Sequence, residues 1–349
     1  MNLKNITTAA LALFTSTTML SQTYVAMVKP EGSKEWGYIK VDGEYAIEPQ
    51  FRKCAPFSEN GWAIAQNPKN KEYQFINLNG EWLETEVTDF KLKSTFGFDM
   101  EGFSNGLVAI GKDRKWGYLA ADGSLQIPLK YDNASPFDNG SAVVEKDDKH
   151  LIIDKQGNEY IAPSKVYKIK DFKDGLAPFY TENKKEGFVN GKGEIAIEAK
   201  FERVGYFNGD LAWASNAEGK LGFINKTGEW VINPQFDAVK DFIAGEALTR
   251  VKKDDNWTYV NRSGEIVNLN VEDKNDFSEG LSYGRKGELV GFYDTSGTWV
   301  IPPQFEAVRN FKNGYAAARK GDQWGLIDKT GAWVLQPEFA SIKDVEKVN

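Results

Sequence analysis

Tryptophan is the residue type in this chain most suited to ligand chemistry, because an aromatic face can pack on a flat ligand such as a sugar. The chain has ten tryptophans in 349 residues, and eight of them recur in two sets. The first set is Trp36, Trp116, Trp257 and Trp324, and the second is Trp82, Trp230, Trp299 and Trp333. A recurring aromatic residue predicts packing between units, because it buries a large area. Trp62 and Trp213 lie outside both sets and are therefore the ligand-binding candidates.

The single cysteine and the single histidine exclude several kinds of site. One cysteine cannot form an intrachain disulfide, and one cysteine with one histidine cannot build a Cys/His metal site within one chain. Cys54 falls in an apolar column of the repeat described below, whose other members are Ala134, Val204, Val239 and Val308. A free cysteine in such a column behaves as a small apolar residue, which predicts burial.

No catalytic group is indicated by spacing. His150 has no serine, cysteine or aspartate partner at a fixed distance along the chain. The acidic residues are scattered, so no pair for glycoside hydrolysis is singled out, although two carboxylates could meet in three dimensions. We therefore predict no catalytic residue, no metal and no cofactor, and keep a glycan-acting hydrolase as an alternative.

Aspartate and asparagine recur in the pattern Asp/Asn-x-x-Gly, which occurs at residues 154–157, 225–228, 261–264, 294–297 and 328–331. Calcium needs about six to eight oxygen ligands at one point, and one side chain per turn does not supply them. An Asx side chain can instead accept a hydrogen bond from the backbone two residues on, while glycine supplies a positive φ. The pattern therefore predicts β-hairpins closed by a turn with a glycine bulge.

These turn glycines reveal a repeat of about 36 residues, because they recur along the whole chain. They are Gly43, Gly80, Gly123, Gly157, Gly193, Gly228, Gly264, Gly297 and Gly331. A unit has an apolar strand with Trp-Gly or its equivalent, the turn, and a return strand, which in the clearest copies reads Trp-Val-Ile-x-Pro, where proline marks a strand end or an edge. A short fourth piece and Phe-x-x-Gly-x-Ala follow, and the small residue at the last position predicts a crowded inner strand. No segment shows helical periodicity, so the fold class is all-β.

We expect about nine antiparallel units of three to four strands. Their approximate bounds are residues 24–60, 61–104, 105–139, 140–173, 174–208, 209–243, 244–278, 279–312 and 313–349. A propeller with the alanine-rich strand innermost is favoured, although nine units are numerous for one ring. An open or superhelical array is the alternative, because such arrays grow without limit. The chain is expected to stop after the outer strand of unit nine.

The units carry a family resemblance. WGYIKVDGEYAIEPQF, LGFINKTGEWVINPQF and WGLIDKTGAWVLQPEF, each followed by Phe-x-x-Gly-x-Ala, resemble the WG repeat family of bacterial surface and exported proteins. Units two and four depart from the pattern, with Gln74 and Leu151 in place of glycine. The resemblance implies an interaction or binding module, and the repeat itself implies no catalytic residue.

Charge and the N-terminal segment bear on partners and location. With 43 basic and 50 acidic residues, the chain lacks the basic block that nucleic acid or anionic lipid attracts. Residues 1–21 resemble a signal peptide, with Lys4 before an apolar stretch, and no other stretch is apolar enough to span a membrane. We therefore expect an exported protein in the periplasm, on the cell surface or secreted, with residues 22–349 forming the repeat array.

The function expected from the sequence is a non-enzymatic binding or scaffold module that presents its repeat surface to a protein or glycan partner. A structural role in maintaining the envelope is the alternative. Neither the partner nor the oligomeric state follows from the sequence.

Overall fold

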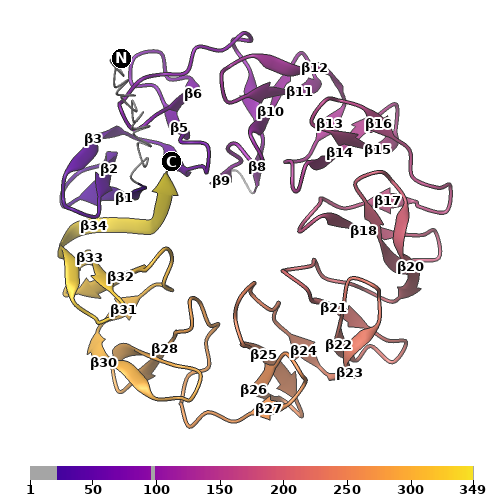
Figure 1. Cartoon of the computed structure of the whole chain (residues 1–349). Coiled ribbons are helices and arrows are strands. Elements are labelled where there is room, and N and C mark those ends of the chain that lie inside the picture. The colour runs from indigo at the N-terminus through magenta and orange to yellow at the C-terminus, as the bar shows by residue number, and fades with distance from the viewer. Residues whose placement is uncertain (1–21, 96–98, 349) are drawn as a thin grey trace, which may run out of the picture.

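The computed structural model describes residues 22–95 and 99–348, and these residues form strands and turns without a helix (Figure 1). The signal peptide expected at residues 1–21 lies outside the described residues. Small antiparallel blades follow one another around a ring, and the first and ninth blades are joined in one seven-stranded sheet (Figure 1). The propeller-like, all-β prediction is confirmed.

Eight blades contain the three strands of the predicted meander, and in the second blade an isolated bridge between Ile76 and Trp82 replaces the outer strand. The strands of the small-residue column are β1 (Thr23–Pro30), β5 (Ala63–Gln66), β10 (Leu107–Lys112), β14 (Ser141–Lys146), β18 (Leu176–Tyr180), β21 (Ala212–Ser215), β25 (Leu248–Lys253), β28 (Ser282–Lys286) and β32 (Tyr315–Lys320). The middle strands, which contain the Trp-Gly column, are β2 (Trp36–Lys40), β6 (Tyr73–Ile76), β11 (Lys115–Ala120), β15 (Lys149–Asp154), β19 (Glu186–Asn190), β22 (Leu221–Ile224), β26 (Asn256–Asn261), β29 (Leu289–Tyr293) and β33 (Gln323–Asp328). The outer strands are β3 (Tyr45–Phe51), β12 (Leu125–Tyr131), β16 (Glu159–Tyr160), β20 (Ile195–Phe201), β23 (Trp230–Phe236), β27 (Ile266–Val267), β30 (Trp299–Phe305) and β34 (Trp333–Val348).

In most blades a fourth, short strand pairs with the small-residue strand on the side nearer the centre of the ring. The expectation that the alanine-rich strand is innermost was therefore wrong. The short piece before the phenylalanine pairs with that strand and takes the inner edge. These strands are β4 (Cys54–Phe57), β7 (Lys91–Leu92), β13 (Asn133–Ala134), β17 (Lys168–Ile169), β24 (Ala238–Val239) and β31 (Ala307–Val308). A separate hairpin of β8 (Ser94–Thr95) and β9 (Asp99–Met100) interrupts the long linker after the second blade.

The ends of the chain close the ring. Strand β34 is the outer strand of the ninth blade as far as Phe339, which pairs with Trp324. It then continues and pairs antiparallel with β1, with Val345 opposite Ala26 (Figure 1). The chain therefore does not stop at the outer strand of unit nine, and its last residues supply the innermost strand of the first blade. This pairing decides between the ring and the open array.

The glycine of the Trp-Gly column is required by close backbone approach. A Cβ atom on Gly37 would lie 2.7 Å from the carbonyl oxygen of Ile47 on the outer strand. The same contact recurs in the other blades that have a seven-residue outer strand or the matching part of β34. Blades two, four and seven have Gln74, Leu151 and Thr258 at this position, and their outer strands are reduced to a bridge or to two residues. Blades without the glycine therefore also lack a full-length outer strand.

Aromatic pairs join successive blades. In seven blades the third residue of the Trp-Gly strand is aromatic and packs edge-on or tilted against the phenylalanine of the next Phe-x-x-Gly segment, as Tyr118 does on Phe137 at 4.8 Å between ring centroids. The equivalent pair Phe292 and Phe311 is 4.7 Å apart. Such geometry is favourable beyond area burial alone. The core is thus a series of clusters between blades, as in other repeat proteins.

Candidate functional site

A hollow of about 660 Å³ opens between the first and second blades, and we call it the seam hollow because it adjoins the joint between β1 and β34. Its apolar and aromatic lining is Met27, Trp36, Ala55, Pro56, Tyr73 and Met100. Its basic lining is Arg52, Lys53 and Lys343, and Cys54 completes it. Ligand sites commonly have about 300–1,000 Å³ and a mainly apolar lining with a few polar groups. The seam hollow therefore has the size and character of a small-ligand site.

Six different elements of the chain build the seam hollow. Strands β1 and β2 supply Met27 and Trp36, and the closing strand β34 supplies Lys343. The second blade adds β4 and the middle-strand residue Tyr73. Met100 comes from the β8–β9 hairpin, which has no counterpart in the regular units. The hollow thus forms where the closing strand and the irregular second unit meet.

Positive charge gathers around the indole of Trp36. The Nζ atoms of Lys29 and Lys343 lie over this ring, 5.4 and 5.8 Å from its centroid. Such ammonium groups are attracted to the negative face of the ring. Within the described residues, no salt bridge involves Lys29, Arg52, Lys53 or Lys343, and no acidic side chain lines the seam hollow.

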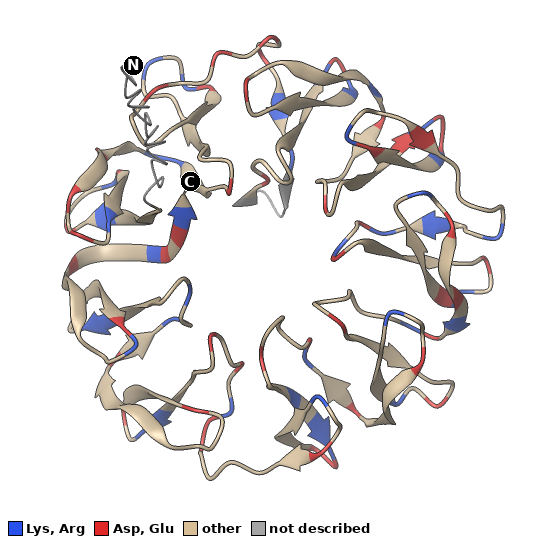
Figure 2. Cartoon of the chain, in the orientation of Figure 1, with Lys and Arg blue, Asp and Glu red and all other residues tan. Residues whose placement is uncertain are grey.

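The acidic residues beside Lys343 are paired elsewhere. Asp344 lies 3.9 Å from Arg309, and Glu346 lies 2.7 Å from Lys312, both in the ninth blade. Acidic and basic residues are otherwise mixed around the ring (Figure 2). The positive seam hollow is therefore a local feature of a chain with a net charge of −7.

Cys54 is half-buried at the seam hollow, so the predicted burial is only partial. It lies on β4, the innermost strand of the second blade, and its side chain lines the hollow. Burial raises the pKa of the Cys54 thiol to about 12, although a hydrogen bond with Tyr38 opposes the rise. The thiol is therefore uncharged near neutral pH and adds no negative charge to the lining.

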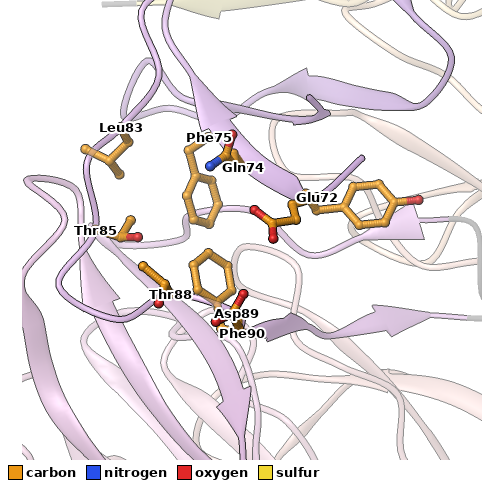
Figure 3. Close-up of a pocket in the computed structure, with 9 residues that line it drawn as sticks. Glu72, Gln74, Phe75, Leu83, Thr85, Thr88, Asp89 and Phe90 are labelled. Carbon is orange, nitrogen blue, oxygen red and sulfur yellow. The ribbon is translucent and has the colours of Figure 1, made fainter. Parts of the chain in front are cut away.

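A second, smaller hollow of about 230 Å³ adjoins the first, and Tyr73 lines both. In Figure 3, Phe75 and Phe90 face each other, with Leu83, Thr85 and Thr88 to one side. The rings of Phe75 and Phe90 are stacked with centroids 6.0 Å apart. The linker that carries residues 83–90 occupies the place of a regular outer strand here, because Leu83 donates its backbone N–H to Phe75.

The two tryptophans proposed from the sequence lie in different blades. Trp62 is half-buried just before β5 and packs on the cluster between the second and third blades. Trp213 lies on β21 in the sixth blade, half-buried, with its ring against Gly205. Burial raises the pKa of Asp241, although a hydrogen bond from Trp213 opposes the rise. The structure does not bring the two together, and their role in binding stays a prediction.

The repeat can now be compared with known proteins. The model of the WG containing repeat matches residues 36–71, 116–149, 152–184, 187–220, 222–257, 291–324 and 324–347. The chain belongs to the WG containing repeat family. Among curated proteins, the comparison finds no match.

Several solved structures resemble the WG repeat ring at low identity. BamB from Moraxella catarrhalis is 11% identical with a TM-score of 0.40, over 80% of this chain and 90% of that one. Apo AztD from Citrobacter koseri is 11% identical with a TM-score of 0.40, over 93% of this chain and 98% of that one. The dihydro-heme d1 dehydrogenase NirN is 10% identical with a TM-score of 0.36, over 93% of this chain and 74% of that one. Likeness at this level supports no statement about function.

Most of the recurring tryptophans of the WG repeat are half-buried, as their columns predict, whereas Trp257 is exposed. In the return strand, Trp82 lies edge-on against Phe51 and Trp333 against Phe305, each from the preceding blade. In the Trp-Gly column, Trp257 and Trp324 have arginine side chains over their rings. These residues therefore serve mainly the contacts within and between blades.

The basic residues of the seam hollow were not identified from the sequence, although a signal for one of them is present. In units three, five and six, an acidic residue after the outer strand pairs with a lysine before the Trp-Gly strand, as Asp132 does with Lys115 at 2.6 Å. Unit one has the reverse charges, Arg52 and Glu35, which line a common hollow without forming a salt bridge. A comparison of charges by column would have singled out Arg52.

Two other observations concern possible sites. Ile161 and Tyr167 are exposed beside β15, where a hollow of about 200 Å³ also contacts His150. Burial lowers the pKa of His150, and Glu145 opposes this effect.

Among the described residues, no group of acidic, histidine or cysteine side chains is arranged to hold a metal ion, and no helix could span a membrane.

Proposed function

We propose that this protein is an exported, non-enzymatic binding module, and that the seam hollow is where its protein or glycan partner engages the ring. The observation that carries the proposal is the seam hollow itself. It gathers residues that break the repeat, such as Arg52 and Met100, around the closing strand. Residues in the regular columns serve packing, so departures from the pattern are where a ligand would be recognised.

A pull-down from envelope extract together with a glycan array, using residues 22–349, tests this proposal. The informative variant is Tyr73→Ala, since Tyr73 lines both hollows. The matched control is Trp116→Ala, at the same column of the third blade. We expect Tyr73→Ala to lose the partner and Trp116→Ala to retain it, with folding checked by circular dichroism. Equal retention by both variants would place the partner elsewhere.

Export is part of the proposal and has its own test. N-terminal sequencing of the protein recovered from the periplasm or the medium is expected to begin at Gln22, after removal of residues 1–21. Recovery of the chain with its Met1 in the cytoplasm would contradict it.

Two other functions are set against the binding module. An envelope-maintenance role predicts a damaged envelope on gene deletion, whereas loss of a single partner with a normal envelope favours the binding module. A glycan-acting hydrolase needs two carboxylates facing one substrate. The seam hollow has no acidic side chain among its described lining residues, so it offers no such pair.

A further inference from the structure

We propose that the seam hollow binds an anionic ligand, an oxyanion group carried on an apolar, planar body. The inference rests on the proposed function, because it names the ligand class for the same hollow. Carboxylate, sulfonate and phosphate groups share the chemistry concerned. A free organic acid and the acidic end of a protein partner could both supply it.

The basic side chains at the hollow lack acidic partners among the described residues. Lys343 and Lys53 line the hollow and Lys29 adjoins it at the Trp36 ring, and no described acidic side chain forms a salt bridge with any of the three. Like charges held together raise the local potential, and the low-dielectric walls of a hollow concentrate it. An incoming oxyanion would supply the partner that these ammonium groups lack, through charge-assisted hydrogen bonds.

The apolar walls of the hollow suit an apolar ligand body. Met27 and Met100 flank the hollow, and Tyr73 adds an aromatic wall. Methionine side chains are flexible and polarizable, so they adapt to the outline of an apolar group. At about 660 Å³ the hollow is large enough for a molecule of two fused or linked rings.

The occupied face of Trp36 favours an anionic ligand over a neutral sugar. A sugar would need an open aromatic face, but two ammonium groups already lie over the Trp36 ring. The ring holds both ammonium groups beside the hollow, because Trp36 and Lys343 themselves line it. Trp36 therefore positions the cations, and the cations recognise the ligand.

A pair of matched fluorescent probes tests the inference with the purified protein. The anionic probe is 8-anilinonaphthalene-1-sulfonate, and the neutral probe is N-phenyl-1-naphthylamine, which has the same ring system without the sulfonate. We expect the anionic probe to bind at least about tenfold more tightly than the neutral one, and more weakly as salt is added. Equal affinity for the two probes, or no binding of either, would overturn the inference.

Variants assign the binding to the seam hollow. Lys29→Gln combined with Lys343→Gln is expected to weaken the anionic probe about tenfold and to leave the neutral probe unchanged. The control combines Lys286→Gln and Lys320→Gln, two exposed lysines in the eighth and ninth blades. If the first pair lowers stability, Lys53→Glu serves instead, because Lys53 is exposed. An unchanged anionic probe in these variants would contradict the inference.

The two proposals can fail separately. A partner that is retained by the wild type and by Lys29→Gln/Lys343→Gln alike would leave the binding module standing and remove the anionic ligand. Conversely, the anionic probe could depend on both lysines while no partner is found in the extract or on the array. That result would support the anionic ligand and remove the proposed protein or glycan partner.

Discussion

The Nζ atom of Lys343 lies 5.8 Å from the centroid of the Trp36 ring. Lys343 belongs to the last strand of the chain and Trp36 to the first Trp-Gly strand, so residues from the two ends of the sequence share one contact. The contact forms only because β34 pairs with β1. Closure of the ring and construction of the seam hollow are therefore the same structural event.

Because β34 closes the ring, a charged residue introduced into its buried face is expected to lower the stability of the fold strongly. Val345 is 1% exposed and opposite Ala26, so Val345→Asp would bury an unpaired carboxylate. We expect destabilisation of about 3 kcal/mol or more, measured as a lower denaturation midpoint in urea. The control is Lys347→Gln on the same strand, where the side chain is exposed. Equal midpoints for the two variants would mean that the closing strand does not stabilise the ring.

The backbone contact at the Trp-Gly column predicts a different response in different blades. In Gly325→Ala the new Cβ would meet the carbonyl oxygen of Leu335, so we expect a loss of about 1–3 kcal/mol. Thr258→Ala changes the same column in the seventh blade, where the outer strand has two residues, and should cost less than about 1 kcal/mol. Thermal unfolding of both variants checks the contrast. The explanation fails if Gly325→Ala is as stable as the wild type.

The aromatic pair between the eighth and ninth blades predicts coupling. Phe292→Leu and Phe311→Leu each remove one partner of rings 4.7 Å apart. A double-mutant cycle should give a coupling free energy of about 0.5–1.5 kcal/mol. Phe292→Leu with Phe242→Leu, from another pair, should be additive, because these residues belong to separate clusters.

The Asx turns predict a dependence of stability on pH. Hydrogen bonds from Thr330, together with backbone donors, hold the pKa of Asp328 below its usual value. A lowered folded-state pKa stabilises the fold above the ordinary aspartate value of about 3.9. This stabilisation is lost as the pH falls through the folded-state value. Asp328→Asn keeps the turn, because asparagine occupies the same column at Asn225, and should flatten this part of the profile.

Denaturation midpoints between about pH 5 and pH 2 would measure the effect, since the loss spans the interval below the unfolded aspartate value. The comparison is between the wild type and Asp328→Asn, with Asn225→Asp as the converse change. An identical slope for all three would show that these hydrogen bonds do not favour the charged form.

We expect the Cys54 thiol to react slowly with alkylating reagents. With a pKa of about 12, its thiolate is scarce at pH 8, and alkylation requires the thiolate. We expect native protein to react with iodoacetamide at least about tenfold more slowly than the same protein in urea, where the thiol has its ordinary pKa. Mass spectrometry over time measures both rates. Equal rates would indicate a thiolate that is not disfavoured by its surroundings.

Much of the fold follows from local sequence. The Asx-x-x-Gly turns form as expected, with Asn225 accepting backbone hydrogen bonds from Thr227 and Glu229. The hairpin, the middle strand and the return strand are all set by residues within a few positions of each other. The Trp-Gly glycine adds one short-range contact across the hairpin. Each of these features depends on neighbours along the chain, so a single unit contains the information.

The position of the short fourth strand does not follow from local sequence. It pairs with the next small-residue strand across a turn, and its two-residue length in β31 leaves little pattern to recognise. The same limit applies to Arg52 and Lys53, which are unremarkable polar residues until Lys343 and Trp36 are placed beside them.

By itself, the sequence determined the repeat, the antiparallel meander of each unit and the packing role of most tryptophans, because these rest on contacts of short range. Only the tertiary structure decided that the array closes and where the seam hollow lies. Val345 must pair with Ala26, and Lys343 must reach Trp36, across the full length of the chain. Contacts of that separation depend on the summed curvature of all the blades, which no single unit encodes.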